Sequence, residues 1–285
     1  MNIILVDTSY TTFHRFFASI RWFSFAKKKI YTIYKNNPTY DWSQNIDFMN
    51  NYKKMYLKGI IDLIGETIFK KSIVIFCMDA PQNTLWRNEI TSCYKGNRTD
   101  MTEKYNLKPT FKYTYDILIP ELLKTNPHMH SILRNNMEAD DIIALATRYI
   151  RYKHSGRTIY IVSGDADFLQ LGYKNLYIAD YKKKNTMIHL THEEAREALR
   201  RKIVVGDNSD NIPSIFPPDM KISNKTKKQI REYKDEMKLF LEKNDEVKKL
   251  YLHNKKLISF RYIPKHFRKP IYKIIKHIIK NNKKK

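Results

Sequence analysis

The chain has 285 residues, of which 42% are hydrophobic, and this is enough for one large α/β domain with an appended helical part or for two small domains. Its 53 Lys and Arg residues against 29 Asp and Glu give a formal net charge of +24, which favours a polyanionic partner, with nucleic acid the first candidate. A bias of the whole proteome toward Lys, Asn and Ile would produce a similar excess. Charge alone therefore does not decide the function.

No stretch approaches the length of about eighteen apolar residues that a membrane span needs, and Asp7 interrupts the apolar start Met1–Val6 before a signal-peptide core could form. We therefore expect no membrane partner. The two cysteines, Cys77 and Cys93, are too few for a disulfide framework, which favours an intracellular, reducing setting. The terminal Lys283–Lys285 fit a nuclear signal as well as a charged chain end, so cytoplasm and nucleus both stay open.

Three short runs rich in β-branched residues predict buried parallel strands, and each has an acid at or shortly after its carboxyl end. The runs and their acids are Asn2–Val6 with Asp7, Ser72–Met78 with Asp79, and Thr158–Val162 with Asp165. Between the first two runs, residues 47–70 repeat apolar side chains at helical spacing, which predicts a strand, helix, strand unit. Open parallel sheets bind ligands at the carboxyl ends of their strands, so we expect the three acids to converge on one crevice.

A further helix is expected to begin near Asn136, which can cap it, with Glu138, Asp140 and Asp141 in its first turn. Acids in a first turn also serve simply as complements of the helix dipole. This group by itself therefore has two explanations.

The rest of the chain predicts a last pair of strands at the sheet edge, Leu176–Ala179 and Thr186–Leu190. From Thr191 the pattern becomes helical, and beyond Lys221 it is rich in lysine. We therefore expect the sheet to end near residue 190.

Nine acids stand out by their placement at strand ends, helix starts and turns. They are Asp7, Asp79, Glu138, Asp140, Asp141, Asp165, Asp167, Asp207 and Asp210. Like charges packed together cost free energy unless cations neutralise them. Hard oxygen ligands favour Mg²⁺ or Mn²⁺ over zinc, and the sequence has no Cys/His set with zinc spacing. Each group alone fits a turn or a helix start, but their joint placement does not.

Six short motifs, in order, carry a family resemblance. They are Ile4-Leu5-Val6-Asp7, Met78-Asp79, Tyr94-Lys95-Gly96-Asn97-Arg98, Glu138-Ala139-Asp140-Asp141, Ser163-Gly164-Asp165-Ala166-Asp167-Phe168 and Gly206-Asp207-Asn208-Ser209-Asp210-Asn211-Ile212-Pro213. In order and spacing they resemble the 5′ nuclease family, which includes flap endonucleases and the bacterial and bacteriophage 5′→3′ exonucleases. From the first motif to Pro213 at the end of the last, they span about three quarters of the chain.

The resemblance implies an α/β fold: a PIN-like nuclease core over residues 1–190, with a mostly parallel central sheet and helices on both faces. It also implies two Mg²⁺ or Mn²⁺ ions. One would be held by Asp7, Asp79, Glu138, Asp140 and Asp141, and the other by Asp165, Asp167, Asp207 and Asp210. We expect Asp79 and Asp167 to be indispensable for hydrolysis.

The resemblance further implies a helical arch, about residues 80–130, with Lys95 and Arg98 as a basic pair at its base. Cationic side chains there can hold the scissile phosphate and offset charge in the transition state. The segment also contains the aromatic side chains of Tyr105, Phe111, Tyr113 and Tyr115. These fit a grip on a single strand and a helix face packed on the core equally well.

Residues 191–285 are expected to form a helical, DNA-binding region with a basic tail. In the family, a helix, three-turn, helix element holds duplex backbone through glycine amides, often with a potassium ion. Here Ser214–Lys221 lacks those glycines, and Pro217 and Pro218 have no N–H, so we expect a degenerate element and dispensable potassium. Duplex binding would then depend on the cationic side chains of Lys221, Lys225, Lys227 and Lys228.

The leading expectation is a monomeric nuclease that acts on DNA with a 5′ flap or a 5′ end in replication or repair. A ribonuclease acting on RNA primers or transcripts is the alternative, because the same metal site hydrolyses either backbone. A non-catalytic nucleic-acid binder is a third possibility, and the presence of all nine acids argues against it.

Overall fold

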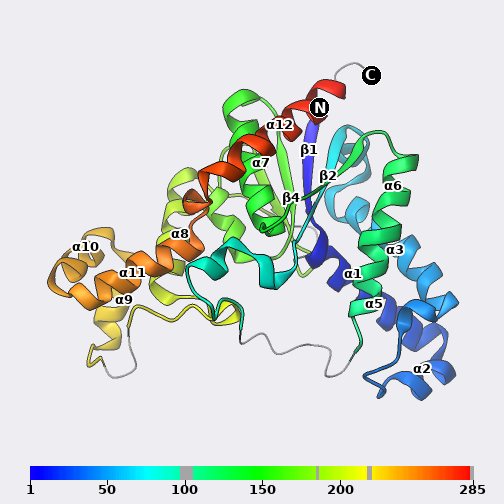
Figure 1. Ribbon diagram of the computed structural model, residues 1–285, viewed down its shortest axis with the longest axis horizontal. Coiled ribbons are helices and arrows are strands. Elements are labelled where there is room, and N and C mark those ends of the chain that lie inside the picture. Colours follow the sequence, from blue (N-terminus) through cyan, green and yellow to red (C-terminus); the bar gives the residue numbers. More distant parts are fainter. Residues whose placement is uncertain (97–104, 184–185, 217–219, 283–285) are drawn as a thin grey trace.

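The computed structural model describes residues 1–96, 105–183, 186–216 and 220–282. Within these residues, the centre is a six-stranded sheet with the order β3-β2-β1-β4-β5-β6 (Figure 1). The strands are β1 (Asn2–Asp7), β2 (Ser72–Met78), β3 (Met129–Leu133), β4 (Ile159–Val162), β5 (Leu176–Ala179) and β6 (Met187–Ile188). Every pair is parallel except β5 with β6, which is antiparallel. The mostly parallel sheet with a closing edge pair is therefore confirmed.

Helices surround the sheet and continue beyond it. In the described part of the chain they are α1 (Thr8–Ala26), α2 (Lys28–Tyr34), α3 (Ile46–Ile64), α4 (Glu66–Lys70), α5 (Lys108–Tyr113), α6 (Ile119–Thr125), α7 (Ala139–Lys153), α8 (His192–Val205), α9 (Asn224–Glu232), α10 (Lys234–Lys243), α11 (Asp245–Ile258) and α12 (Lys265–Asn281). A π-helical turn, Thr114–Leu118, joins α5 to α6. Among the described residues, no helix combines the length and the apolar character that crossing a bilayer requires.

The two faces of the sheet bury separate hydrophobic clusters, because side chains alternate along each strand. Ile4 and Val6 pack on the side of α1, α3 and α6, whereas Ile3 and Leu5 pack on the side of α7 and α12. The expectation of helices on both faces is therefore confirmed. This layering leaves the carboxyl edge of the sheet as the place where strand ends and helix starts meet.

The last helix returns to the sheet. Ile271, Ile275 and Ile278 of α12 recur at helical spacing, are buried, and share a cluster with Ile142 of α7. Figure 1 shows α12 beside α7, with the two ends of the chain near each other. The C-terminal helix therefore contributes to the core that we expected residues 1–190 to form alone.

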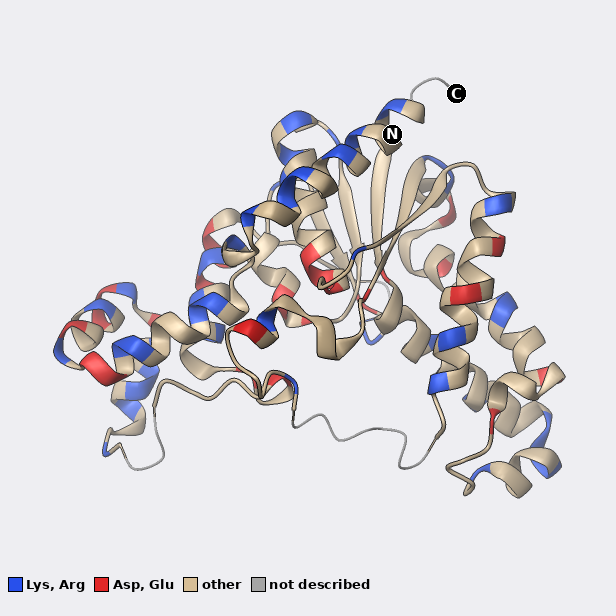
Figure 2. Cartoon of the chain, in the orientation of Figure 1, with Lys and Arg blue, Asp and Glu red and all other residues tan. Residues whose placement is uncertain are grey.

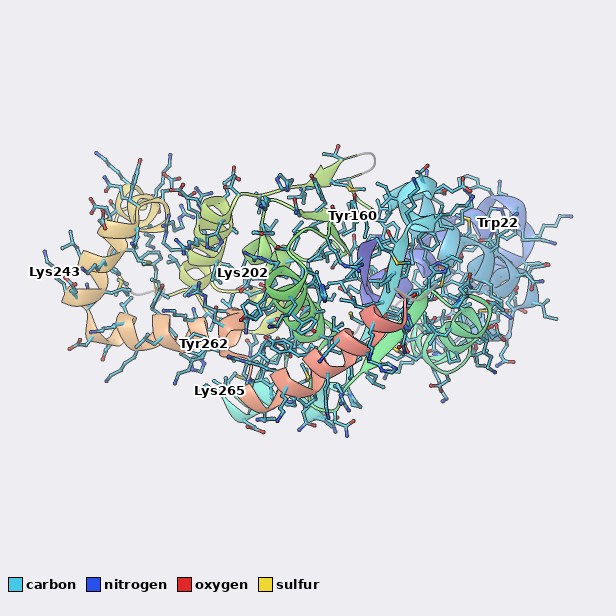
Figure 3. All side chains as sticks on the ribbon, turned by 90° about the horizontal axis from the view of Figure 1, so that it is seen from above. Trp22, Tyr160, Lys202, Lys243, Tyr262 and Lys265 are labelled. Atoms are coloured by element: carbon cyan, nitrogen blue, oxygen red, sulfur yellow. The ribbon has the colours of Figure 1, made fainter. Side chains whose placement is uncertain are left out.

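The helices α9, α10 and α11 extend away from the sheet. They enclose a small hydrophobic cluster that includes Ile230, Met237 and Val247 and is shared with Val204 at the end of α8. Viewed from above, Lys243 of α10 lies near one end of the elongated molecule and Trp22 of α1 near the other (Figure 3). The acidic edge of the sheet lies between these two helical extensions.

Several helix boundaries differ from those expected. The helix expected over residues 47–70 is divided at Gly65, whose φ of 92° ends α3 and starts α4 in a new direction. The expected cap, Asn136, instead occupies a turn with φ of 64°, and Glu138 is the N-cap residue of α7. The sequence pattern also did not predict α1, α2 or the edge strand β3.

The aromatic side chains of the expected arch pack on the core. The Tyr105 ring lies 6.0 Å from that of Phe16 and 5.5 Å from that of Phe17, measured between centroids. Phe111 and Tyr113 pack against the same cluster. The packed face of the two explanations is therefore observed, while Phe111 also lines the cleft at the acidic edge, so a grip on a single strand stays a prediction.

A buried arginine joins three parts of the chain. Arg87 lies in the 3-10 turn η3 (Trp86–Glu89), and its guanidinium lies 2.6 Å from the carboxylate of Glu138 and 2.9 Å from that of Asp141. Its Nε donates to the carbonyl oxygen of Leu257, in the last turn of α11, at 2.9 Å. The guanidinium fork satisfies both carboxylates, which makes the burial of all three charges tolerable. This contact fixes the start of α7 against the C-terminal region.

Arg87→Gln is expected to lower the free energy of unfolding by about 3–5 kcal/mol, because it leaves two buried carboxylates without their cation. Urea unfolding followed by circular dichroism measures this loss. Lys58→Gln, which removes an exposed pair with Asp62, is the matched control and should cost less than about 1 kcal/mol. Equal, small losses in the two variants would contradict the role given to Arg87.

Candidate active site

Parallel register brings several predicted residues to one edge of the sheet. Asp7 is the last residue of β1 and pairs with Cys77, two positions before Asp79. Because β4 is aligned with β1, Ser163 follows beside Asp7 and donates to its Oδ2 at 2.9 Å. Two of the predicted acids thus lie at neighbouring strand ends.

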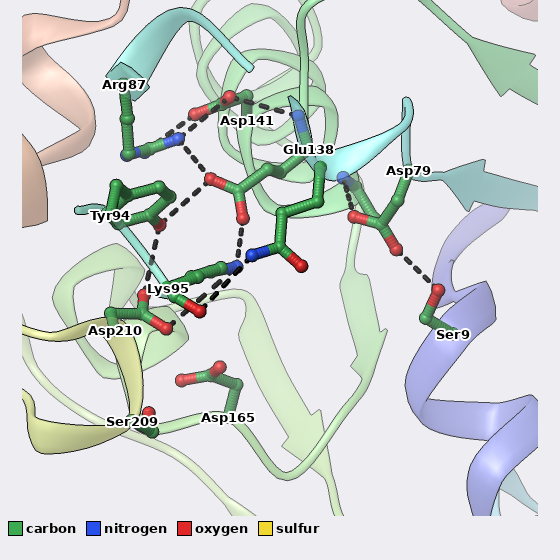
Figure 4. Close-up of polar contacts among 12 residues, drawn as sticks. Ser9, Asp79, Arg87, Tyr94, Lys95, Glu138, Asp141, Asp165, Ser209 and Asp210 are labelled. Atoms are coloured by element: carbon green, nitrogen blue, oxygen red, sulfur yellow. Dashed lines mark hydrogen bonds and ion pairs between the residues drawn. The ribbon is translucent and has the colours of Figure 1, made fainter. Parts of the chain in front are cut away.

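Hydrogen bonds fix the orientation of these two aspartates. Asp7 Oδ1 accepts from the backbone N–H of Tyr10 at 3.0 Å and thereby caps α1. Asp79 Oδ1 accepts from the backbone N–H of Ala139 at 2.8 Å, and its Oδ2 accepts from the Ser9 hydroxyl at 2.5 Å (Figure 4). The strand end after β2 is therefore tied to the starts of both α1 and α7.

A cleft of about 530 Å³, here named the acid cleft, opens at this edge of the sheet. The predicted acids that line it are Asp7, Asp79, Glu138, Asp140 and Asp165. Gly164 also lines it, and a Cβ at that position would lie 2.5 Å from the Tyr10 hydroxyl and 2.8 Å from Oδ1 of Asp180. Glycine is therefore the residue that lets the chain pass this wall of the cleft.

The remaining acids form two overlapping groups. Ligand atoms of Asp140, Asp165 and Asp167 lie within 4.8 Å of one another, and so do those of Asp167, Asp207 and Asp210. Asp167 belongs to both groups. The resemblance placed Asp140 in a different metal site from Asp165 and Asp167, and the structure brings ligand atoms of all three together, so the division between two ions stays a prediction. These atoms meet because the start of α7 and the turn after β4 face each other across the strand ends.

Lys202 is an internal counter-charge that the sequence did not predict. Its Nζ lies 2.5 Å from Asp167, 2.8 Å from Asp207 and 3.9 Å from Asp165. Burial lowers the pKa of this ammonium, but Asp167 and Asp165 outweigh burial and hold the pKa above its usual value. The only available signal was a lysine in the last turn of a helix, one turn before the Gly206-Asp207 motif.

Lys95, predicted as a catalytic cation, is buried rather than exposed on a solvated turn. Its ammonium pairs with Glu138 and lies 4.0 Å from Oδ1 of Asp210 (Figure 4). Lys95 and Asn211 both have left-handed backbone, with φ of 58° and 59°. Reciprocal bonds hold these turns together: Lys95 N donates to Asp210 O, and Asn211 Nδ2 donates to Cys93 O, both at 3.0 Å. These two hydrogen bonds offset the conformational cost of the left-handed backbone, which is roughly 1–3 kcal/mol for each residue.

Glu138 and Asp141 have structural partners. Both carboxylate oxygens of Asp141 accept from Arg87, and its Oδ2 also accepts from Trp86 Nε1 at 2.8 Å, in a fully buried position. These contacts make Asp141 part of the framework at the start of α7, and its expected role as a metal ligand stays a prediction. Burial raises the pKa of Glu138, but Arg87 and Lys95 outweigh it and hold the pKa below its usual value.

Two further residues near Asp79 also lacked an assigned role in the sequence. The Tyr115 hydroxyl lies 2.8 Å from Ser9 Oγ and accepts from the backbone N–H of Asp79 at 3.3 Å. Ser9 stands two positions after Asp7, and this proximity is its only sequence signal. No pattern linked Tyr115 to Asp79 across 36 residues. Arg98, the other predicted basic residue, lies outside the described residues.

The predicted nucleic-acid-binding lysines lie on or just before α9. Lys221, Lys225 and Lys228 are exposed, while Lys227 is half-buried with its ammonium 5.9 Å from the centre of the Phe216 ring. The described lining of the acid cleft does not include them. They lie on or next to the helical extension, where Figure 2 shows Lys and Arg positions interspersed with a few acidic ones.

Burial gives several of the acids raised pKa values. Burial, followed by the neighbouring Asp79, raises the pKa of Asp7 from 3.8 to about 7. Burial raises the pKa of Asp167 to about 7 although Lys202 opposes the shift. Burial also raises the pKa of Asp140 well above its usual value. Without a bound cation, full ionisation of this cluster therefore costs free energy.

The donor set fits divalent cations. The two groups consist of Asp side chains, whose hard oxygens suit Mg²⁺ and Mn²⁺. Sharing Asp167 would allow two ions to be held side by side. Lys202 lies among these carboxylates as a counter-charge, and Lys95 lies at their margin. These residues can therefore hold metal ions.

The metal-free protein is expected to lose stability as pH rises from about 4 to 7. The folded-state pKa of Asp7, about 7, exceeds its ordinary value of 3.8, so between these values the folded chain holds a proton that the unfolded chain has lost. Asp7→Asn removes the share of this dependence that Asp7 contributes and should gain on the order of 2 kcal/mol relative to the unaltered protein over that range. Urea unfolding in EDTA at a series of pH values measures it, with the exposed Asp62→Asn as control. A constant difference across pH would contradict the assignment.

Lys202→Met is expected to lower the melting temperature more in EDTA than in Mg²⁺. Without this ammonium, Asp167 and Asp207 lose their counter-charge, whereas a bound cation would replace it. A shift of roughly 2–4 °C corresponds to each kcal/mol lost. Differential scanning calorimetry of Lys202→Met and the exposed control Lys58→Met, with and without Mg²⁺, makes the comparison. The idea fails if Mg²⁺ leaves the deficit unchanged.

Comparison with known proteins agrees with this architecture. A family model described as the 5′-3′ exonuclease, N-terminal resolvase-like domain matches residues 2–200. A 5′-3′ exonuclease of Mycoplasmopsis pulmonis is 29% identical over 178 residues, which cover 59% of this chain and 55% of that protein. Ribonuclease H of Enterobacteria phage T4 is 27% identical over 210 residues, which cover 67% of this chain and 65% of that protein. The chain thus spans little more than half the length of the first of these curated relatives.

A solved structure supports the same fold over nearly the whole chain. It is a bacteriophage T5 flap endonuclease, described as a pseudo-enzyme-product complex with DNA and metal ions. It aligns with a TM-score of 0.62 at 17% identity, covering 98% of this chain and 99% of that one. The family match over residues 2–200 takes in more than half of the 285 residues. The resemblance found in the motifs is confirmed, and this chain belongs to the family of the 5′-3′ exonuclease N-terminal, resolvase-like domain.

Proposed function

We propose that this chain is a divalent-metal-dependent 5′ nuclease that hydrolyses phosphodiester bonds of DNA at 5′ flaps or 5′ ends, in replication or repair. One observation carries the proposal. Two clusters of three aspartates share Asp167, and they lie beside a cleft that Lys95 lines. The names of the relatives, 5′-3′ exonuclease and flap endonuclease, support the same reaction.

The chemistry follows from charge placed around one phosphate. Two Mg²⁺ or Mn²⁺ ions, when bound, supply activation of a water and stabilisation of the leaving oxygen. The side chains that would hold them are Asp140, Asp165, Asp167, Asp207 and Asp210, with Asp7, Asp79 and Glu138 completing the acidic edge. Lys95, on the cleft wall, would offset the charge that develops on the phosphate, and we give Arg98 the same role.

Binding of the substrate would come mainly from cations outside the acid cleft. Lys221, Lys225, Lys227 and Lys228, on or next to the helical extension, are suited to backbone phosphates of a duplex arm. Because these are point charges, the binding needs no potassium ion. The protein would act as a monomer in an intracellular setting.

A ribonuclease activity is the second candidate. It is favoured by the T4 relative, which carries the name Ribonuclease H at 27% identity. Carboxylate-held cations act on the phosphodiester, which RNA and DNA share, so the acid cleft itself does not distinguish them.

Cleavage of matched DNA and RNA substrates with 5′ flaps, titrated with Mg²⁺ and Mn²⁺, tests both candidates. Asp79→Ala and Asp167→Ala are expected to lower the rate of hydrolysis by at least about 10³-fold while leaving DNA binding largely intact, because phosphate contacts from Lys and Arg supply most of the affinity. Asp62→Ala, an exposed acid paired with Lys58, is the matched control. Substantial cutting by both site variants would refute the metal site, and cutting of RNA alone would replace the leading candidate with the second.

A further inference from the structure

A second cavity, of about 700 Å³, lies between α7, α8, the 3-10 turn η6 (Ala166–Leu171) and the 3-10 turn η8 (Phe260–Tyr262). Six cationic side chains line this cationic cavity: Arg148, Arg151, Arg196, Lys234, Lys255 and Arg261. The described lining contains no Asp or Glu. With 29 acids against 53 cations in the chain, six charged residues drawn at random would include roughly two carboxylates. The charge of the cavity is thus more one-sided than the composition predicts.

Among the described residues, the cations of the cavity have no carboxylate partner. Within the described part of the chain, no carboxylate oxygen lies within 4.0 Å of any of the six, in contrast to the paired Arg87 and Lys202. Burial, and then the neighbouring Arg148, lower the pKa of Arg151. Burial, and then Arg196, lower the pKa of His192, which also lines the cavity. The charges therefore repel one another and would be stabilised by an anion.

Fixed elements form the walls of the cavity. A guanidinium nitrogen of Arg148 donates to the carbonyl oxygen of Phe260 at 3.2 Å. Gln170 donates to the carbonyl oxygen of Ile258 and accepts from the backbone N–H of Phe260, both at 3.0 Å. The Arg151 guanidinium lies 4.0 Å from the centre of the Tyr173 ring. Side chains held in this way can present their cations without further ordering.

The cavity lies at a short distance from the catalytic acids, along two shared helices. At about 1.5 Å per residue, Arg148 and Arg151 lie roughly 12 and 16 Å along α7 from Asp140. By the same measure, Arg196 lies about 9 Å along α8 from Lys202. One strand of DNA advances about 3.4 Å per nucleotide, so roughly three to five nucleotides cover this distance. Figure 2 shows Lys and Arg gathered where α8 and α11 meet.

We infer that the cationic cavity is a second phosphate-binding site, which takes backbone phosphates of the nucleic acid whose 5′ part occupies the acid cleft. The inference rests on the proposed function for its ligand. Arginine favours this ligand because the guanidinium fork can bind two phosphate oxygens at once, and four of the six lining cations are arginines. Nucleic acid also supplies several phosphates in a row, and several negative charges are needed to neutralise six neighbouring cations.

The test is DNA binding in EDTA, where hydrolysis does not interfere. The variant Arg196→Gln/Lys234→Gln/Arg261→Gln removes three exposed cations of the cavity. The matched control, Lys54→Gln/Lys71→Gln/Lys124→Gln, removes three exposed cations on α3, directly before β2 and on α6, away from the lining of the cavity. Affinity for a labelled 5′-tailed duplex is measured by fluorescence anisotropy over a series of salt concentrations, and thermal melting checks that both variants fold.

The cavity variant is expected to bind about tenfold more weakly or worse, and to flatten the slope of log K against log salt by up to about 2.7, or 0.9 for each of three lost phosphate contacts. The control should keep the affinity within about twofold and the slope unchanged. Equal losses in both variants, or no loss in the cavity variant, would overturn the inference. If the triple variant melts early, Arg196→Gln and Arg261→Gln singly carry the same comparison.

A titration with inorganic tripolyphosphate separates the two sources of phosphate. The site is supported if tripolyphosphate displaces DNA from the unaltered protein and does so less effectively from the cavity variant. If tripolyphosphate binds at the cavity while DNA binding is the same in both proteins, the cavity takes small polyphosphates and the inference is wrong. Because no arm depends on cleavage, a protein that passes these tests but cuts no 5′ flap refutes the proposed function alone.

Discussion

Repulsion among carboxylates at the carboxyl edge of the sheet is the constraint on which the rest of this structure depends. Parallel strands end side by side, so Asp7 and Asp79 are brought together by the same register that builds the core. The start of α7 and the turns after β4 and α8 add further acids to the same edge. Such a cluster is tolerable only with protonation, internal cations or bound metal ions, and the side chains described here show the first two as raised pKa values and as Lys202.

The internal cations divide the acids into two kinds. Arg87 is fully enclosed and occupies both oxygens of Asp141, so this pair belongs to the framework that holds α7. Lys202 instead lies between Asp167 and Asp207, which keep 13% and 18% of their side-chain surface exposed and pair with no other cation among the described residues. A buried, fully satisfied ion pair cannot be exchanged for a metal without loss, whereas an ammonium among carboxylates that reach solvent can move away. Burial and partners, more than residue type, therefore separate structural acids from ligands.

The same helices connect charges of opposite sign. The acids lie in the first turn of α7, while Arg148 and Arg151 lie toward its other end, an arrangement that also complements the helix dipole. On α8, Arg196 lines the cationic cavity and Lys202 contacts the acids. Rigid helices thus fix the spacing between the place where phosphate would be cut and the place where phosphate would be held. On both α7 and α8, this spacing is set by the helix backbone and not by the flexibility of a side chain.

The sequence by itself determined the elements whose signals are local. Short runs rich in β-branched residues with acids at their ends, and motifs such as Ser163-Gly164-Asp165, were enough to predict most strands of the sheet, its acidic edge and the family. Only the tertiary structure decided which acids face which cations. Arg87 meets Asp141 across 54 residues, and the grouping of Asp140 with Asp167 depends on how α7 packs against β4. Partner choice over such separations is set by packing, which no local spacing encodes.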